Sequence, residues 1–176
     1  MSETEHDGEA HSDGEHAAHG GGEHAHEHPP HTGSLIGTWH LETWVSLVDD
    51  GTKAAPMGPS PEGMLAYAPD GTMITVFGRA ERERDRFATD DLTGGTTDER
   101  SAAFSSFIAY GGRYAIDGST VIHTVEVSLF PNWVGTTQRR HWALDEDGDR
   151  LTLVSPPITV GGQTRTQRLV WRRTRR

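Results

Sequence analysis

The sequence predicts an all-β protein: an eight-stranded antiparallel up-and-down barrel with one short helix and a disordered N-terminal tail. Eight short segments between residues 35 and 172 are rich in β-branched, aromatic or alternating apolar residues. Gly, Pro and Asp, which favour turns, separate neighbouring segments, and only one segment has a helical pattern. Eight strands enclose enough room for packed side chains or one small ligand, so the predicted fold is that of a container.

The first three strands are the clearest. Residues 35–47 alternate between apolar and polar side chains, and the apolar face consists of Leu35, Trp39, Leu41, Val45 and Leu47. Residues 63–68 and 72–77 form a predicted hairpin, because proline and glycine in the intervening Pro69-Asp70-Gly71 suit a tight turn. The other predicted strands are 113–116, 121–129, 136–144, 150–154 and 164–172.

One helix is predicted after a charged, irregular loop at residues 78–95. Thr96-x-x-Glu99 has the form of a capping box, in which each side chain bonds the other residue's backbone N–H. An apolar stripe follows, and Gly111-Gly112 is expected to end the helix. We expect this helix to pack on the sheet as a lid or plug through the stripe, which comprises Ala103, Phe104, Phe107 and Ile108.

Residues 121–142 predict the hairpin that carries most of the polar groups facing the barrel interior. With 130–135 as the connection, His123 lies opposite Trp142 and Glu126 lies opposite Arg139. Alternation then sends one set of side chains inward: His123, Val125, Val127, Leu129, Gln138, Arg140, Trp142 and Leu144. A slip of one residue in the register would instead turn Glu126 into the cavity.

His123, Gln138 and Arg140 are therefore the leading ligand-binding candidates. Arg140 supplies a fixed cation, and the imidazole of His123 exchanges a proton near neutral pH in an ordinary environment. The alternative is a purely structural network in which these side chains are satisfied by other protein groups. Further candidates are Glu126 if the register slips, Asn132 and Trp133 as a gate or plug at the barrel mouth, and Tyr67 and Tyr110 as cavity hydroxyls or packing residues.

The N-terminal segment, residues 1–33, is predicted to be disordered because it has almost no apolar side chains to bury. It carries eight acidic residues and no Lys or Arg, so residues 34–176, the predicted barrel domain, hold only −2 of the net charge of −10. Eight of the eleven histidines lie in this segment. Closely spaced imidazoles can bind zinc, nickel or copper, and the best-placed are His19, His24, His26, His28 and His31. The alternative is a solvated tail whose charge changes near pH 6.5.

Several classes of protein are disfavoured. No apolar run is long enough to span a membrane, and the N-terminus lacks a secretory signal pattern, so a cytoplasmic location is the default expectation. The absence of cysteine excludes disulfides, a thiolate nucleophile and Cys-ligated metals. The basic residues cluster only at 172–176 of an acidic chain, which argues against nucleic acid as a partner. The known motifs for serine hydrolases, phosphate loops, dinucleotide folds and zinc proteases do not occur, and we expect no cofactor in the barrel.

Several motifs together resemble the bacterial and fungal lipocalin-like domain family over about residues 35–172. They are Gly37-Thr38-Trp39, Tyr67-Ala-Pro-Asp-Gly71, Phe107-Ile-Ala-Tyr-Gly-Gly-Arg-Tyr114, Ser128-Leu-Phe-Pro-Asn-Trp-Val-Gly135 and Asp149-Arg-Leu-Thr-Leu153. The resemblance implies a calycin-type barrel whose base is closed by Trp39, with an arginine of the last strand stacked on the indole. Arg168 and Arg172 are the candidates for that cation. The family implies a cavity more strongly than a reaction.

The expected function is binding of a small hydrophobic or aromatic molecule, oriented by a few polar groups. One alternative is a cofactor-free isomerase or cyclase acting on a natural-product-type substrate, in which His123 or Glu126 moves a proton and Arg140 stabilises an oxyanion. Another is metal binding through the His-rich N-terminal segment.

Overall fold

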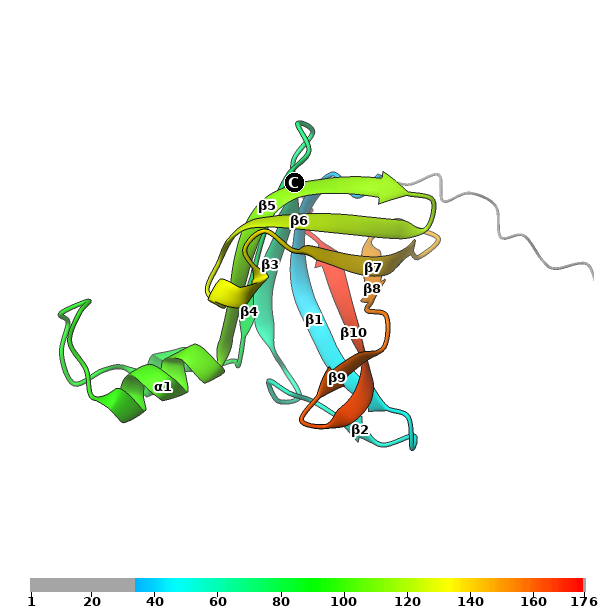
Figure 1. Cartoon of the computed structure of the whole chain (residues 1–176). Helices are drawn as coiled ribbons and strands as arrows, with labels where there is room; N and C mark the ends of the chain where they lie inside the picture. Colours follow the sequence, from blue (N-terminus) through cyan, green and yellow to red (C-terminus); the bar gives the residue numbers. More distant parts are fainter. Residues whose placement is uncertain (1–33, 176) are drawn as a thin grey trace, which may run out of the picture.

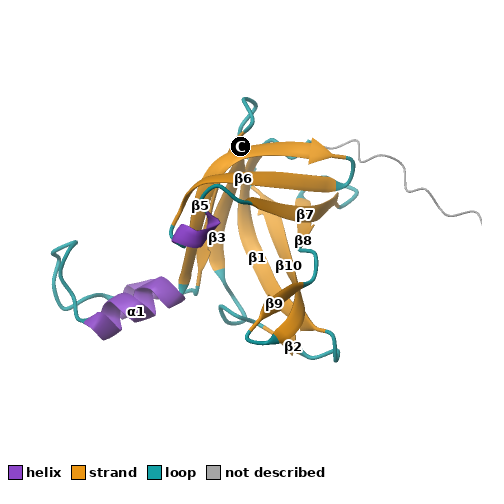
Figure 2. Ribbon diagram, in the orientation of Figure 1, coloured by secondary structure: helices purple, strands orange, loops and turns teal. Residues whose placement is uncertain are grey.

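A computed structural model of the protein describes residues 34–175, in which eight antiparallel strands close into a barrel (Figure 1; Figure 2). The chain order of neighbours is kept around the wall, and β1 pairs with β10 to close it. The predicted barrel with one α-helix is therefore confirmed, while the predicted disorder of residues 1–33 lies outside the described residues. The barrel strands are β1 (Gly37–Val48), β3 (Glu62–Tyr67), β4 (Thr72–Gly78), β5 (Phe107–Asp117), β6 (Thr120–Ser128), β7 (Thr137–Leu144), β8 (Arg150–Val154) and β10 (Gln163–Arg173). Two short strands, β2 (Lys53–Ala54) and β9 (Ile158–Val160), pair with the ends of β1 and β10.

Trp39 closes one end of the barrel. Its side chain is completely buried, and its indole Nε1 donates to the carbonyl of Leu35 at 2.9 Å. The guanidinium of Arg173 lies 4.0 Å from the centre of the ring and also donates to the carbonyls of Ile36 and Ser34. The prediction that Arg168 or Arg172 would stack on Trp39 is wrong, because alternation turns those two side chains outward and Arg173 inward.

Two bulges change which side chains face the interior. In β1 the register shifts between Leu41 and Thr43, so Trp44 and Ser46 turn inward in place of the predicted Val45 and Leu47. The second bulge lies between Gly111 and Gly112 of β5. A Cβ atom on Gly112 would lie 2.1 Å from the carbonyl oxygen of Thr124, so only glycine fits there.

The helix α1 (Thr97–Ser105) begins as predicted but ends early. The Thr96 hydroxyl accepts from the N–H of Glu99, and the Glu99 carboxylate accepts from the N–H of Thr96, which completes the capping box. Phe107 and Ile108 belong to β5, where they pair with Gly78 and Phe77, and Gly111-Gly112 lies within that strand.

The prediction that α1 covers the sheet is also wrong. None of its residues is buried, and the helix projects away from the barrel wall (Figure 1). Without Phe107 and Ile108 its apolar stripe is too short to cover a sheet. Its C-terminal end is held instead by Arg82, which donates to the carbonyl of Ala103 and lies 4.8 Å from the centre of the Phe107 ring.

The β6–β7 hairpin has a different register from the predicted one but nearly the same faces. His123 pairs with Gln138, four residues before the predicted partner Trp142, and Arg139 pairs with Ile122 rather than Glu126. A slip by an even number of residues leaves each side chain on the same face, so His123, Val125, Gln138 and Arg140 still face inward. Val127 does not: Glu126 is an extra residue in β6 opposite Gly111-Gly112, and this bulge turns Val127 outward, where it is 62% exposed. Leu129 is also exposed.

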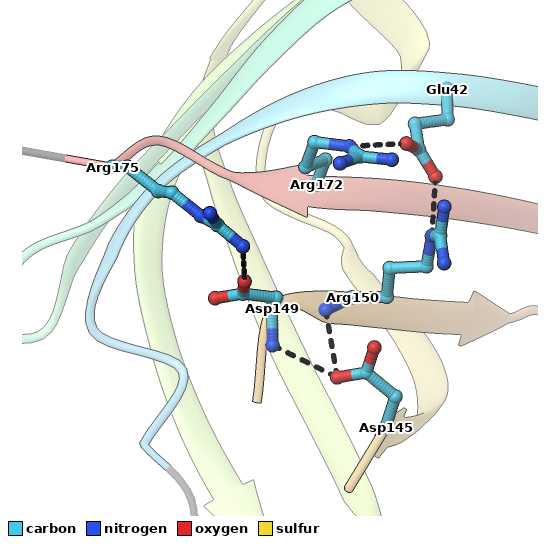
Figure 3. Close-up of polar contacts among 6 residues, drawn as sticks. All are labelled: Glu42, Asp145, Asp149, Arg150, Arg172 and Arg175. Carbon is cyan, nitrogen blue, oxygen red and sulfur yellow. Dashed lines mark hydrogen bonds and ion pairs between the residues drawn. The ribbon is translucent and has the colours of Figure 1, made fainter. Parts of the chain in front are cut away.

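Ion pairs on the outer surface connect three strands (Figure 3). Glu42 of β1 accepts from Arg172 of β10 at 2.5 Å and from Arg150 of β8 at 2.9 Å. Beside them Arg175 pairs with Asp149 at 2.5 Å. The two arginines hold the pKa of the Glu42 carboxyl below its usual value through hydrogen bonds, partly opposed by burial.

We expect Glu42→Gln to lower the free energy of unfolding by less than about 2 kcal/mol, because each exposed pair contributes only about 0.2–1 kcal/mol. The loss should shrink in concentrated salt, which screens the pairs. Urea titrations at low and high ionic strength measure both effects. Glu62→Gln, at an exposed residue outside this network, is the control and should change stability little. An equal loss in both variants would contradict a stabilising role for the pairs.

Candidate functional site

Three strands bring Tyr67, Tyr110 and His123 together inside the barrel. Tyr67 ends β3, Tyr110 lies on β5, and His123 lies on β6, where alternation points all three inward. The Tyr67 hydroxyl lies 2.7 Å from Nε2 of His123, and the Tyr110 hydroxyl lies 3.0 Å from Nδ1. Each is buried, so the three side chains form one hydrogen-bonded chain in the interior.

Burial keeps every member of this chain neutral. It lowers the pKa of His123 to about 3, with a smaller contribution from the nearby positive charge of Arg140. Burial also raises the pKa of both tyrosine hydroxyls, well above the usual value for Tyr67. His123 therefore does not act as the near-neutral proton exchanger that its residue type suggests.

Counting protons shows that this chain has a donor to spare. A neutral imidazole has one N–H and one acceptor nitrogen. One tyrosine must donate to His123, while the other accepts from it, so the hydroxyl proton of the accepting tyrosine is not used within the chain. An oxygen acceptor on a ligand would satisfy that proton.

Arg140 and Gln138 lie beside this chain on β7. Gln138 is directly opposite His123 in the sheet, and its side-chain oxygen lies 3.4 Å from Nη2 of Arg140. Nη1 of Arg140 donates to the carbonyl of Arg139 at 2.7 Å. No carboxylate oxygen of residues 34–175 for which side chains are described lies within 4.0 Å of the Arg140 guanidinium. Arg140 thus supplies a half-buried positive charge whose hydrogen-bond partners are neutral.

An apolar pocket of about 230 Å³ lies at the mouth of the barrel. The short helix η2 (Pro131–Trp133) supplies Trp133, whose ring packs edge-on against Tyr110 with 5.6 Å between centres. Trp133 therefore separates the mouth from the buried polar chain. The pocket is lined mainly by apolar side chains, among them Met57, Phe104, Phe107, Ile108, Leu129 and Phe130.

The other predicted site residues lie elsewhere. Glu126 is the extra residue of the bulge between β5 and β6 and is exposed, so the register that would place it in the cavity is wrong. Asn132 is exposed in η2. His19, His24, His26, His28 and His31 lie outside the described residues, so the prediction of a metal site there stays a prediction. Within residues 34–175, no cluster of three potential metal ligands occurs.

Sequence reasoning missed Trp171 of β10. Its side chain is buried facing inward, and its indole N–H has no hydrogen-bond partner among the described residues. Leaving such a donor unpaired costs about 1–3 kcal/mol, which makes it a second interior group able to bind an acceptor. Trp171 lies two residues after Leu169 in the last predicted strand, so both share one apolar face. This spacing is the sequence signal that identifies Trp171 as an interior residue.

A larger groove of about 430 Å³ lies on the outer surface, between the strand wall and the loop after β4. Its lining includes exposed or polar groups such as His40, Glu62 and Arg82. Arg82 is already bonded to the end of α1. The groove is separate from the buried polar chain, whose three members do not line it.

A model of the lipocalin-like domain family matches residues 36–174. The chain belongs to the lipocalin-like domain family. The base of this lipocalin-like barrel agrees with the expectation from that resemblance, with Arg173 as the stacked cation. The chain is also 36% identical over 91 residues to the "4'-hydroxy-3'-methoxypropiophenone carrier protein" of Aspergillus oryzae, an alignment that covers 47% of this chain and 81% of that relative. Both findings support a small-molecule-binding role for the lipocalin-like domain.

In the described part of the chain no helix has the length and apolar character needed to span a membrane.

Proposed function

We propose that this lipocalin-like protein is a carrier for a small, mostly apolar aromatic molecule that carries an oxygen acceptor. The observation that supports this most directly is the buried chain of Tyr67, His123 and Tyr110, which has a spare hydroxyl proton, beneath an apolar pocket. Ligand sites typically combine an apolar wall with a few placed polar groups. A pocket of about 230 Å³ suits a ligand with one aromatic ring.

Tyr110 is the group of the chain placed to meet the ligand. It contacts both His123 and Trp133, so it lies between the polar chain and the mouth. In this proposal Tyr67 donates to Nε2 of His123, Nδ1–H donates to the oxygen of Tyr110, and the Tyr110 hydroxyl donates to the ligand. Trp133 moves aside to admit the ring and then packs against it.

The isomerase or cyclase alternative loses its two candidate bases. Glu126 is exposed on the outside of the wall, and His123 is a weak base with a pKa of about 3. A general base works best when its pKa lies near the operating pH. Carriage without turnover is therefore the function that the geometry favours.

Binding of 4'-hydroxy-3'-methoxypropiophenone, measured by titration calorimetry and by quenching of tryptophan fluorescence, tests the carrier proposal. We expect Tyr110→Phe to weaken binding by about 3–10-fold, because it removes one hydrogen bond and keeps the ring. Tyr114→Phe is the matched control on the same strand: the Tyr114 hydroxyl donates to the carbonyl of Ala68, outside the chain, so affinity should not change. No detectable binding of this ketone to the wild-type protein would contradict the proposal for this ligand class, and equal losses in both variants would contradict the role of Tyr110.

A further inference from the structure

We propose that the barrel binds its aromatic ligand as an oxyanion, a phenolate whose charge is balanced by Arg140. The inference rests on the carrier function proposed above and adds the ionisation state of the ligand. It depends on three features of the interior: the charge environment of Arg140, the direction of the hydrogen bonds, and the location of the acidic side chains.

No described carboxylate lies within 4.0 Å of the Arg140 guanidinium. The guanidinium is half-buried, and its two hydrogen bonds go to neutral oxygens, the carbonyl of Arg139 and the side chain of Gln138. Arg150 and Arg172, on the outer face of the same barrel, both pair with Glu42. A partly desolvated guanidinium gains most from an anionic partner, because it is always charged and forms strong charge-assisted hydrogen bonds to oxygen anions.

The polar groups that surround this charge offer mainly donors. Arg140 has only N–H groups, and the chain of Tyr67, His123 and Tyr110 has its unused proton on a hydroxyl. The oxygen of Gln138 already accepts from Arg140. An oxyanion accepts hydrogen bonds without donating one, so it matches this set better than a neutral hydroxyl, which would need an acceptor of its own.

Among the side chains that the structure describes, no acidic group competes for the position next to Arg140. Glu126, the carboxylate nearest in sequence to His123 on β6, is exposed on the outer face. The outward residues of β7 next to Arg140 are Arg139 and His141. The apolar pocket at the mouth, with Trp133 at its inner edge, would hold the aromatic ring while the oxygen points toward Tyr110, whose hydroxyl lies in the electrostatic field of Arg140.

The change of binding affinity with pH should then be set by ionisation of the ligand, not of the protein. The titratable groups that face Arg140 are Tyr67 from β3, Tyr110 from β5 and His123 from β6. Burial raises the pKa of both tyrosines and lowers that of His123 to about 3, so none of the three groups changes charge between pH 6 and 8. Affinity for an acidic phenol should therefore rise with pH as the phenol ionises, and affinity for its methyl ether should not.

The test compares the hydroxylated ketone used as the carrier probe with the ether in which its phenolic O–H is methylated. We expect the wild-type protein at pH 8 to bind the phenol about tenfold more tightly than the ether. The absorption band of the bound phenol should also lie at the position of the free phenolate at a pH where the free ligand is mostly protonated. Arg140→Gln should abolish both the preference and the shifted band. Arg139→Gln, the adjacent and outward-facing residue on the same strand, should preserve them.

The outcomes separate the inference from the carrier proposal. Equal affinity for phenol and ether in the wild-type protein would overturn the anionic state while leaving the carrier function standing. A preference for the phenol that survives Arg140→Gln would overturn the role of Arg140. Failure of both compounds to bind would overturn both proposals for this ligand class. The absorption measurement needs only the wild-type protein, so it decides the ionisation state even if a variant folds poorly.

Discussion

Replacing Trp39 with alanine should lower the free energy of unfolding by about 3–5 kcal/mol, the largest single-residue effect that we expect in this protein. The indole is completely buried at the base of the barrel. Its removal leaves a large cavity, breaks the hydrogen bond to the Leu35 carbonyl and deprives Arg173 of the ring on which it stacks. Urea unfolding followed by far-ultraviolet circular dichroism measures the loss.

Trp133→Ala is the matched control for that substitution. It removes the same side chain from the mouth of the barrel, where Trp133 is only half-buried and lies in a short helix. We expect it to cost clearly less, because less apolar area returns to water and the site is open to solvent. Equal losses for the two substitutions would show that the base is no more important to stability than the mouth.

Acidification from pH 7 to pH 5 should destabilise the fold on the order of 2 kcal/mol through His123 alone. The pKa of His123 is lowered from 6.5 to about 3, first by burial and then by Arg140. In the unfolded chain the imidazole takes up a proton below pH 6.5, whereas in the folded chain it stays neutral until about pH 3. The unfolded state therefore binds more protons in this window, so stability is full above pH 6.5 and is lost as the pH falls toward 3.

The variant His123→Gln isolates this effect, because glutamine can still donate and accept hydrogen bonds but does not titrate. We expect the variant to be less stable at pH 7, since its amide cannot reproduce both contacts to the tyrosines, but to lose less stability than wild type on acidification. Independently, the ring signals of His123 in NMR spectra should stay constant from pH 8 to 5, and a titration of those signals near pH 6.5 would contradict the prediction.

These predictions differ in how far the sequence alone supports them. Alternation of apolar and polar residues was enough to predict the barrel and the inward direction of His123, Arg140 and Trp142, because side chains in a strand alternate whatever the neighbouring strand does. The capping box at Thr96 and Glu99 was equally predictable, since it depends only on residues within one helical turn. The role of Trp39 at the base of the barrel was implied by the resemblance of Gly37-Thr38-Trp39 to the lipocalin-like family.

Tertiary structure decided the features that depend on pairing between distant segments. The register of β6 against β7 differs from the predicted register by four residues, yet the same side chains face the interior. Alternation alone therefore could not determine the register. The bulges that turn Val127 outward and Trp44 inward depend on the neighbouring strands β5 and β10. The spacing of Phe107 and Ile108 also suited a helix, but in the barrel these residues pair with Gly78 and Phe77 of the neighbouring strand β4.

The candidate site shows the same division. The sequence identified His123, Tyr67 and Tyr110 as separate candidates but predicted no contact between them. They lie on three different strands, so their contacts depend on how the strands pair. Only the closed barrel brings both hydroxyls to one imidazole. Local pattern therefore determined which side chains face the interior, and closure of the wall decided which of them meet, because a hydrogen bond depends on distances between strands that no single strand specifies.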